Sequence, residues 1–418
     1  MSDLGTTEPD WKARYEADLV KTFATPPLLL DHGQGAWVWD ADGNKYLDFL
    51  GGIAVNALGH AHPVLIEAVT RQVSLAAHVS NLFASAPQLE LAARLKRLTG
   101  AGEQGRVFFA NSGTEANEAA FKLARLNRGD GSKTRILALV NGFHGRTMGA
   151  LALTGKAYMR EPFEPMPGGV EHIEASLDAL EAAIDDTVAA LVVEPLQGEA
   201  GVLELPEGFF ARARELTERH GALLIVDEVQ TGAGRTGDWF GFQHEGVTPD
   251  AITLAKGMAG GVPIGALVVF GTAAELFGRG QHGSTFGGNP LATAAANAVL
   301  GEIEATGLVE NARTRGAQLK DIVTGLGSSL VAGTRGRGLL IGIVLTVPVA
   351  EQIVAAAREH GLIVNATGPD TVRIAPPLVI GDIELDEFRD RFGAALADVG
   401  AAAAAAAPSP AQGQEVTA

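Results

Sequence analysis

One lysine stands where a charged side chain is costly. Lys256 follows the apolar run ITLA (252–255) and precedes glycines at 257, 260 and 261. The run predicts an interior strand, so the lysine is expected at the end of that strand. Burying an ammonium group is unfavourable unless the group is paired or neutralised. A buried lysine whose pKa is lowered is also a nucleophile that can form a Schiff base with an aldehyde.

A carboxylate occupies a similar place on the preceding predicted strand. Asp227 follows ALLIV (222–226), so its side chain is expected to be buried and to need a cationic or hydrogen-bonding partner. Another strand-like run, RVFFA, is followed by Ser112, Gly113 and Thr114 and then by helical sequence. The unpaired amides of a helix N-terminus suit a phosphate. A plain helix cap, with Ser or Thr followed by Glu, fits the same residues.

Taken together, these features favour pyridoxal 5'-phosphate (PLP) as a cofactor. Its aldehyde would neutralise Lys256 as an imine, and its phosphate would lie on Ser112, Gly113 and Thr114. Asp227 would keep the pyridine nitrogen protonated, so that the ring acts as an electron sink. Phe143, which follows the strand-like RILALVNG, would stack on the ring. The alternative is a structural Lys256 paired with an Asp or Glu, which would account for the lysine but not for the other three features.

The elements that must position these residues are short apolar strands alternating with amphipathic helices. Apolar strands joined by helices indicate an α/β fold with a mostly parallel central sheet flanked by helices. Ligands bind such sheets at the carboxyl ends of the strands, where the polar residues named above all lie. The predicted strands are 106–111, 135–142, 189–195, 222–228, 251–255 and 266–271.

Four segments are predicted along the chain. Residues 1–62 would form hairpins that join a small domain, 63–300 a large PLP-binding domain, 301–400 a smaller C-terminal α+β domain, and 401–418 a disordered tail. Hairpin turns are expected at His32–Gly35 and Asp42–Asn44. The alanine run that begins the tail could extend the preceding helix by a turn or two.

Composition narrows the possible partners and locations. The 418 residues carry a formal net charge of −17, which argues against nucleic acid or an anionic membrane as a partner. The chain has no cysteine, which excludes disulfides and thiolate chemistry. The N-terminus lacks the apolar region of a signal peptide, and no stretch has the length of a membrane span. A soluble, cytoplasmic protein that binds small molecules is expected.

Two other motifs in the sequence suggest different functions. GAGRTG (232–237) fits the G-x-G-x-x-G pattern of nucleotide-dependent dehydrogenases, but three residues separate it from the preceding strand and no helical pattern follows. A mobile glycine-rich loop suits it better. His60 and His62 resemble a metal pair, but no further ligand cluster is evident, so no metal is predicted.

From about residue 20 to 395, the chain resembles the class III (ω-amino) aminotransferases of PLP fold type I. The resemblance rests on several stretches together, and none of them is specific alone. They are GGIAVNALGHAHP, SNLFASAPQLELA, FFANSGTEANEAAFKLAR, FHGRTMGAL, LIVDEVQTGAGRTG and TLAKGMAGGVPIGA.

The resemblance assigns cofactor roles to these positions. It implies that Lys256 is the imine lysine and proton shuttle, that Asp227 pairs with the pyridine nitrogen, and that Gln230 approaches the phenolic oxygen. Phe143 and Val229 would sandwich the ring, and Gly113 and Thr114 would hold the phosphate. Thr285 would reach the phosphate of a neighbouring subunit, with Ser284 beside the substrate, so a homodimer with shared sites is implied.

Substrate roles also follow from the resemblance. An ω-aminotransferase handles a terminal amine in one half-reaction and an α-amine or keto acid in the other, and two arginines can each bind a carboxylate bidentately. Arg146 would bind the distal carboxylate of the donor and Arg373 the α-carboxylate of 2-oxoglutarate or glutamate. Glu199 would pair with Arg373 while the donor is bound and swing aside for the keto acid.

The choice of amino donor depends on one position near the start of the chain. Ornithine-specific members tend to have a tyrosine near the position of Ala54 and Val55 that binds a free α-amine, and this chain has none there. An acylated donor such as an acetylated or succinylated ornithine is therefore favoured. Succinyl-diaminopimelate, free ornithine and 4-aminobutyrate remain alternatives, as do PLP-dependent aminomutation and decarboxylation.

Overall fold

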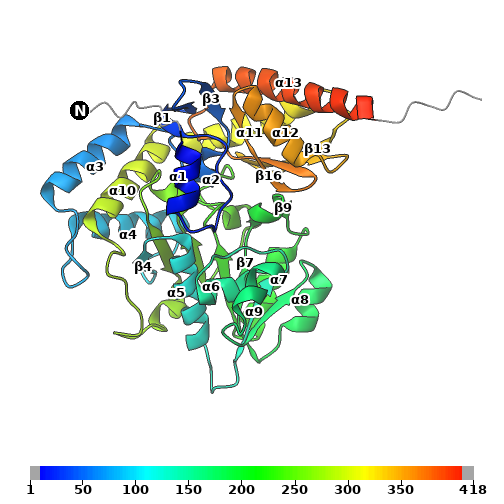
Figure 1. The fold of residues 1–418 in the computed structure, drawn as a ribbon. Helices are drawn as coiled ribbons and strands as arrows, with labels where there is room; N and C mark the ends of the chain where they lie inside the picture. Colours follow the sequence, from blue (N-terminus) through cyan, green and yellow to red (C-terminus); the bar gives the residue numbers. More distant parts are fainter. Residues whose placement is uncertain (1–9, 407–418) are drawn as a thin grey trace, which may run out of the picture.

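The computed structural model describes residues 10–406, and its centre is a seven-stranded sheet with the order β4-β12-β11-β10-β7-β5-β6 (Figure 1). Only β12 runs antiparallel to its neighbours. Several strands are apolar and buried along their whole length because helices cover both faces of the sheet. The strands are β4 (Arg106–Ala110), β5 (Arg135–Leu139), β6 (Val170–Ile173), β7 (Val188–Val193), β10 (Leu223–Asp227), β11 (Ala251–Leu254) and β12 (Gly265–Val269).

The predicted α/β fold is confirmed, and each of the six predicted strands is present. Strand β6 was missed because its sequence VEHI is short, polar at two positions and only partly buried at the sheet edge. The helices of the described chain are α1 (Trp11–Asp18), α2 (Gly51–Ala54), α3 (Pro63–Leu75), α4 (Ala86–Thr99), α5 (Gly113–Leu126), α6 (Met148–Leu153), α7 (Ala157–Arg160), α8 (Leu177–Ala183), α9 (Phe209–Arg219), α10 (Pro290–Ala305), α11 (Leu308–Gly325), α12 (Ala350–Glu359) and α13 (Asp382–Ala406).

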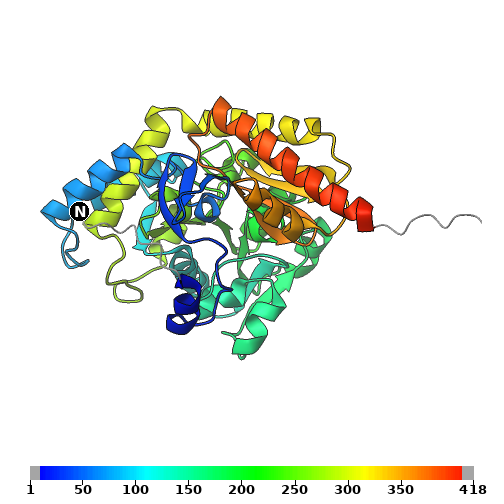
Figure 2. The same cartoon turned by 45° about the horizontal axis from the view of Figure 1, so that its top comes forward.

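Two smaller four-stranded sheets lie with α11, α12 and α13 beyond one end of the central sheet (Figure 1). One joins the N-terminal strands to the C-terminal part of the chain, because β3 pairs in parallel with β15. Helix α13 lies across these elements beside α12 (Figure 2). The strands are β1 (Leu30–Gln34), β2 (Trp37–Asp40), β3 (Lys45–Asp48) and β15 (Leu362–Ile363) in one sheet, and β13 (Val331–Arg337), β14 (Leu340–Leu345), β16 (Asn365–Gly368) and β17 (Thr371–Ile374) in the other. The domain boundaries themselves remain a prediction.

Two local expectations need correction. The first hairpin turn lies at residues 35–36, because Gln34 pairs with Trp37 and residues 32–34 belong to β1. Helix α13 continues to Ala406, so the start of the expected disordered tail is helical, as the high helix propensity of alanine favours. The rest of that tail, 407–418, lies outside the described residues.

Among residues 10–406, no helix combines the length and the apolar character needed to span a bilayer.

Candidate active site

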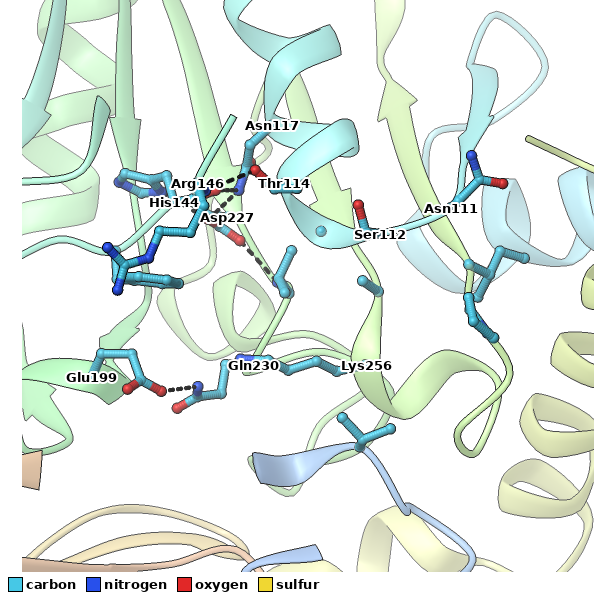
Figure 3. Close-up of a pocket in the computed structure, with 18 of the residues that line it drawn as sticks. Asn111, Ser112, Thr114, Asn117, His144, Arg146, Glu199, Asp227, Gln230 and Lys256 are labelled. Atoms are coloured by element: carbon cyan, nitrogen blue, oxygen red, sulfur yellow. Dashed lines mark hydrogen bonds and ion pairs between the residues drawn. The ribbon is translucent and has the colours of Figure 1, made fainter. Parts of the chain in front are cut away.

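A cavity of about 380 Å³ opens at the carboxyl ends of the central strands (Figure 3). Residues that follow β4, β5, β7, β10 and β11 converge on it, as expected for a ligand site in a parallel sheet. Of the predicted site residues, its lining includes Ser112, Gly113, Thr114, Phe143, Arg146, Glu199, Asp227, Val229, Gln230 and Lys256.

Lys256 begins a short 3-10 turn, Lys256–Met258, directly after β11. Its φ of 40° is in the left-handed region, which residues other than glycine adopt at a cost of about 1–3 kcal/mol. Residues held in this conformation cluster at functional sites. Burial lowers the pKa of Lys256, and the charge of Arg373 adds to this effect against the opposing pull of Glu199 and Asp227. The amine is therefore more easily deprotonated, and more nucleophilic, than that of an exposed lysine.

Asp227 ends β10 and is 3% exposed. One carboxylate oxygen accepts hydrogen bonds from Asn117 Nδ2 and His144 Nδ1, both at 2.7 Å. The other accepts from the Val229 amide at 3.0 Å and from Thr253 Oγ1 at 3.2 Å. This network supplies the partners that a buried carboxylate needs and fixes its direction at the cavity wall (Figure 3).

His144 and Glu194 form a second buried layer beside Asp227. Burial alone would lower the pKa of His144, but the hydrogen bond and charge of Asp227 raise it above its ordinary value. Burial raises the pKa of Glu194 to about 7, and its Oε2 accepts the Phe143 amide at 2.9 Å. The imidazole and Glu194 thus hold the loop after β5, which carries Phe143.

The start of α5 has the features of both a helix cap and a phosphate-binding site. Ser112 is the N-cap, since its Oγ accepts the Glu115 amide at 3.3 Å. The Gly113 and Thr114 amides have no partner within the described chain, as is usual in a first helical turn. A Cβ at Gly113 would lie 2.7 Å from Val229 Cγ1, so only glycine lets the helix end approach Val229. The residues present fit the phosphate and ring of PLP.

Thr114 also holds the loop that carries Arg146. Its Oγ1 accepts the amides of Arg146 at 3.0 Å and Thr147 at 3.1 Å. Arg146 is exposed and pairs with no carboxylate of the described residues, and its guanidinium lies 5.6 Å from the centre of the Phe143 ring. It is free to bind an anion at the mouth of the cavity.

Arg373 lies on β17, is 1% exposed and is not itself part of the cavity lining. Its Nη1 donates to Glu199 Oε1 at 2.6 Å and to Gln230 Oε1 at 3.1 Å, while Gln230 Nε2 donates to the same Glu199 oxygen at 3.1 Å. Burial works to raise the pKa of Glu199, but the charge of Arg373 and its hydrogen bond bring it below the ordinary value. The expected pairing of Glu199 with Arg373 is thus present, and Gln230 belongs to it (the Gln230–Glu199 contact is drawn in Figure 3).

Ser284 and Thr285 do not line this cavity. Ser284 Oγ accepts Asn111 Nδ2 at 3.1 Å, and Asn111 itself lines the cavity. Thr285 is exposed and lines a separate depression with residues of the 78–88 segment. Within one chain the structure therefore separates these two residues from the rest of the predicted site.

Several residues of the site were not singled out as site residues from the sequence. Asn117 and Thr253 bind Asp227, and His144 and Glu194 support it. A usable signal existed for both of the latter, because Glu194 follows the apolar run AALVV (189–193) and His144 comes two residues after the predicted strand 135–142. Asn117 and Thr253 lie inside a helix and a strand, and only the tertiary fold brings them to Asp227. Val55, from the N-terminal segment, closes another side of the cavity.

The dehydrogenase alternative finds no support in the loop that prompted it. The element after GAGRTG is a 3-10 turn, Gly241–Glu245, and not the helix that the motif requires. Ala233, Arg235 and Thr236 are buried, so the expectation of a mobile loop is replaced by a packed one. Glu228 anchors this loop by accepting the Gly241 and Phe242 amides at 2.9 and 2.7 Å.

Comparison with known proteins agrees with the geometry. The family model "Aminotransferase class-III" matches residues 21–396. The acetylornithine aminotransferase of Mycobacterium tuberculosis is 52% identical over 93% of this chain and 96% of its own, and that of Streptomyces coelicolor is 52% identical over 90% and 92%. The solved ornithine aminotransferase of Toxoplasma gondii, with partial occupancy of PLP at its active site, superimposes with a TM-score of 0.89 at 33% identity, covering 96% of both chains. The chain belongs to the class-III aminotransferases.

Proposed function

We propose that this enzyme uses PLP to transfer the terminal amino group of N2-acetyl-L-ornithine to 2-oxoglutarate, giving N-acetyl-L-glutamate 5-semialdehyde and L-glutamate in arginine biosynthesis. The observation that carries the reaction type is one cavity lined by Lys256, Asp227 and Arg146, whose lining residues Glu199 and Gln230 in turn bind Arg373. The choice of donor is supported by relatives at 52% identity that are named acetylornithine aminotransferases.

PLP, when bound, supplies an aldehyde for the amine and a protonated ring that accepts electrons from the reacting carbon. Lys256 would bind the aldehyde and then carry a proton to and from the substrate carbon. Asp227, held by Asn117 and His144, would keep the pyridine nitrogen protonated. The amides at Gly113 and Thr114 would bind the phosphate, and Phe143 and Val229 would flank the ring.

The two arginines would orient the substrates. Arg146 is exposed and has no carboxylate partner within the described chain, so it is available for the α-carboxylate of the donor. Arg373 is already neutralised by Glu199 at 2.6 Å, so the donor carboxylate is directed to Arg146. With 2-oxoglutarate, the same Arg373 would bind the α-carboxylate after Glu199 has moved.

Acetylornithine is expected to be the preferred donor. With 2-oxoglutarate as acceptor, kcat/KM on acetylornithine should exceed that on ornithine by roughly 10- to 100-fold, because the cavity wall at Val55 offers no polar group for a free α-ammonium. Steady-state assays with acetylornithine, succinylornithine, succinyl-diaminopimelate, ornithine and 4-aminobutyrate measure this order. Preference for ornithine or 4-aminobutyrate would contradict the proposed donor, and inactivity with all five would contradict the reaction.

We also propose a homodimer with shared sites. Leu75, Leu82 and Phe83 are 71%, 85% and 69% exposed, and Phe286 is 60% exposed. Asn81 joins these two segments by donating to Ser284 O at 3.1 Å and Gly287 O at 2.9 Å. An apolar surface of this kind marks an interaction site, and Thr285 lies within it. A second copy placed here would receive Thr285 near its phosphate site.

Phe83→Asp is expected to turn the dimer into monomers at micromolar concentration and to remove most of the activity, because a buried unpaired charge opposes association. Light scattering coupled to size-exclusion chromatography measures the mass. Ile383→Asp, at a side chain 70% exposed on α13, is the control and should remain dimeric. A wild-type protein that is monomeric and fully active would contradict the shared site.

A further inference from the structure

Glu199 must leave Arg373 before a keto acid can bind there, and its destination is not part of the proposed function above. Arg373 Nη1 is saturated by Glu199 Oε1 at 2.6 Å, Gln230 Oε1 at 3.1 Å and Gly198 O at 3.2 Å. Its Nη2 is buried and has no partner among the described residues. An incoming carboxylate that binds both nitrogens would share Nη1 with Glu199, and two carboxylates there would repel each other.

The displaced carboxylate needs another cation, because the group is largely buried and its side chain is only 27% exposed. Lys256 also acts on the charge of Glu199, but that amine is committed to the cofactor aldehyde. Arg146 is reserved for the distal carboxylate of the substrate. Among the described residues of the site, the remaining cation is Lys156, whose ammonium interacts with the charges of both Glu199 and Glu194.

Lys156 is already in contact with the residue that must move. Its Nζ donates to the backbone oxygen of Glu199 at 2.7 Å. An ammonium has three donors, and no other hydrogen bond of this one is formed within residues 10–406. Nζ therefore already lies at the backbone of Glu199, and a change of the Glu199 side-chain rotamer is the movement that would bring the carboxylate to it.

Both sides of this contact are held firmly in place. Gly155 Cα packs so closely on the end of β5 that a Cβ there would lie 2.2 Å from Leu139 O, and the Gly155 amide donates to Gly142 O at 2.8 Å. On the other side, Glu199 lies in the 3-10 turn Gly198–Ala200. A Cβ at Gly198 would lie 1.7 Å from Gln230 Oε1, so that turn is fitted to Gln230. The backbone on both sides is therefore fixed, and a movement of the Glu199 carboxylate has to come from its side chain.

We propose that Lys156 is the docking partner of the displaced Glu199 carboxylate, so that Glu199 alternates between Arg373 with the amino donor and Lys156 with the keto acid. Lys156 is thus a positioning residue for the acceptor half-reaction, and the inference rests on the proposed transamination. It touches neither substrate nor cofactor and acts through Glu199 alone.

The test is Lys156→Met, which keeps the length of the side chain and removes the charge. The rate constant of the donor half-reaction should stay within about twofold of the wild-type value. The affinity for 2-oxoglutarate, measured in single-turnover experiments, should fall roughly tenfold, because one charge-assisted hydrogen bond is lost. Titration calorimetry of the holoenzyme with glutarate, an unreactive dicarboxylate, should show the same loss. Lys156→Arg should restore both.

Two further variants separate this role from a structural one. Lys133→Met removes a lysine that also binds backbone carbonyls, of Asp186 and Val188 at 3.3 Å, and should leave the ratio of the two half-reactions unchanged. In a Glu199→Gln background there is no charge to receive, so Lys156→Met should have no further effect on glutarate affinity. Glu199→Gln by itself is expected to harm the donor half-reaction more than the glutamate half-reaction.

The pH dependence gives an independent signature. Burial lowers the pKa of Lys156. The positive charges of Arg373 and Arg146 lower it further, whereas the negative charges of Glu199 and Glu194 act in the opposite direction. The ammonium is therefore lost at a lower pH than in an exposed lysine, and 2-oxoglutarate affinity should fall as pH rises through that pKa. Lys156→Arg should keep its affinity to higher pH.

Equal losses in both half-reactions of Lys156→Met, or an unchanged glutarate affinity, would overturn the role of Lys156 while leaving the transaminase intact. If wild-type enzyme transfers no amino group from any donor, the proposed function fails instead. A crystal structure of the holoenzyme with glutarate is expected to show the Glu199 carboxylate within hydrogen-bonding distance of Lys156 Nζ; a carboxylate still on Arg373 would also overturn the inference.

Discussion

Lys256→Ala is expected to lower kcat of transamination by at least about 10²–10⁴-fold, the range that a positioned proton-transfer group contributes. The lysine is the amine of the cavity whose pKa is lowered by burial, and it is held at φ 40° at the end of β11. Among residues 10–406, no other lysine lines the same cavity. Loss of the side chain would therefore remove both the proposed covalent attachment and the proposed proton carrier.

Stopped-flow measurement of each half-reaction separates these two effects. The alanine variant should still bind PLP, through the α5 amides and Asp227, but without the absorbance of a covalently attached cofactor. Lys256→Arg keeps a positive charge and is the matched control, and it should be as inactive as the alanine variant. Recovery of more than a tenth of wild-type kcat by the arginine variant would show that charge alone suffices and would contradict the assigned role.

Asp227→Asn should give the second largest effect, a fall in kcat of about 10²–10³-fold, comparable to removing one preorganised electrostatic group from an active site. The amide has nearly the shape of the carboxylate but lacks the charge that we propose keeps the pyridine nitrogen protonated. Single-turnover rates with saturating cofactor measure the loss. Asp227→Glu retains the charge and should recover part of the activity.

Removing the side chain altogether should act on stability as well. In Asp227→Ala, the donors of Asn117, His144 and Thr253 lose their buried acceptor, at about 1–3 kcal/mol for each donor left unpaired. Urea unfolding of the cofactor-free protein is the measurement. If Asp227→Asn were as active as wild type while Asp227→Ala unfolded readily, Asp227 would have a structural role only.

Much of the fold and the centre of the site could be predicted because each depends on local sequence. Runs such as VAALVV are apolar throughout and have no alternating pattern, which marks strands buried on both faces. Lys256 and Asp227 are each a charge at the end of such a run. Once the sheet is parallel, their proximity follows from topology without any knowledge of side-chain contacts.

The remainder depends on contacts between distant parts of the chain. Asn117 reaches Asp227 across 110 positions, and nothing in EANEAAFKLAR marks that residue as different from other helix positions. Lys156 acquires its meaning only when Gly155 brings it against the end of β5 and the 3-10 turn places Glu199 beside it. The role proposed for Thr285 would depend on a second subunit, which lies outside a single chain.

The position of the hairpin turn at residues 35–36 has a similar cause. Gly33 looks like a turn residue, but a Cβ there would lie 2.6 Å from the His60 ring, so the glycine allows close packing within strand β1. Glycine is therefore required for close tertiary packing at position 33. At position 35 it is required for the backbone conformation, because the φ of Gly35 is 57°. Sequence spacing cannot distinguish these two uses.

The most direct test is to reduce the holoenzyme with borohydride, digest it and locate the modified peptide by mass spectrometry. The account predicts a pyridoxyl group on the side chain at position 256, in a peptide containing AITLAKGMAGG. A label on Lys156 or another lysine, or no label although the protein transaminates, would contradict it.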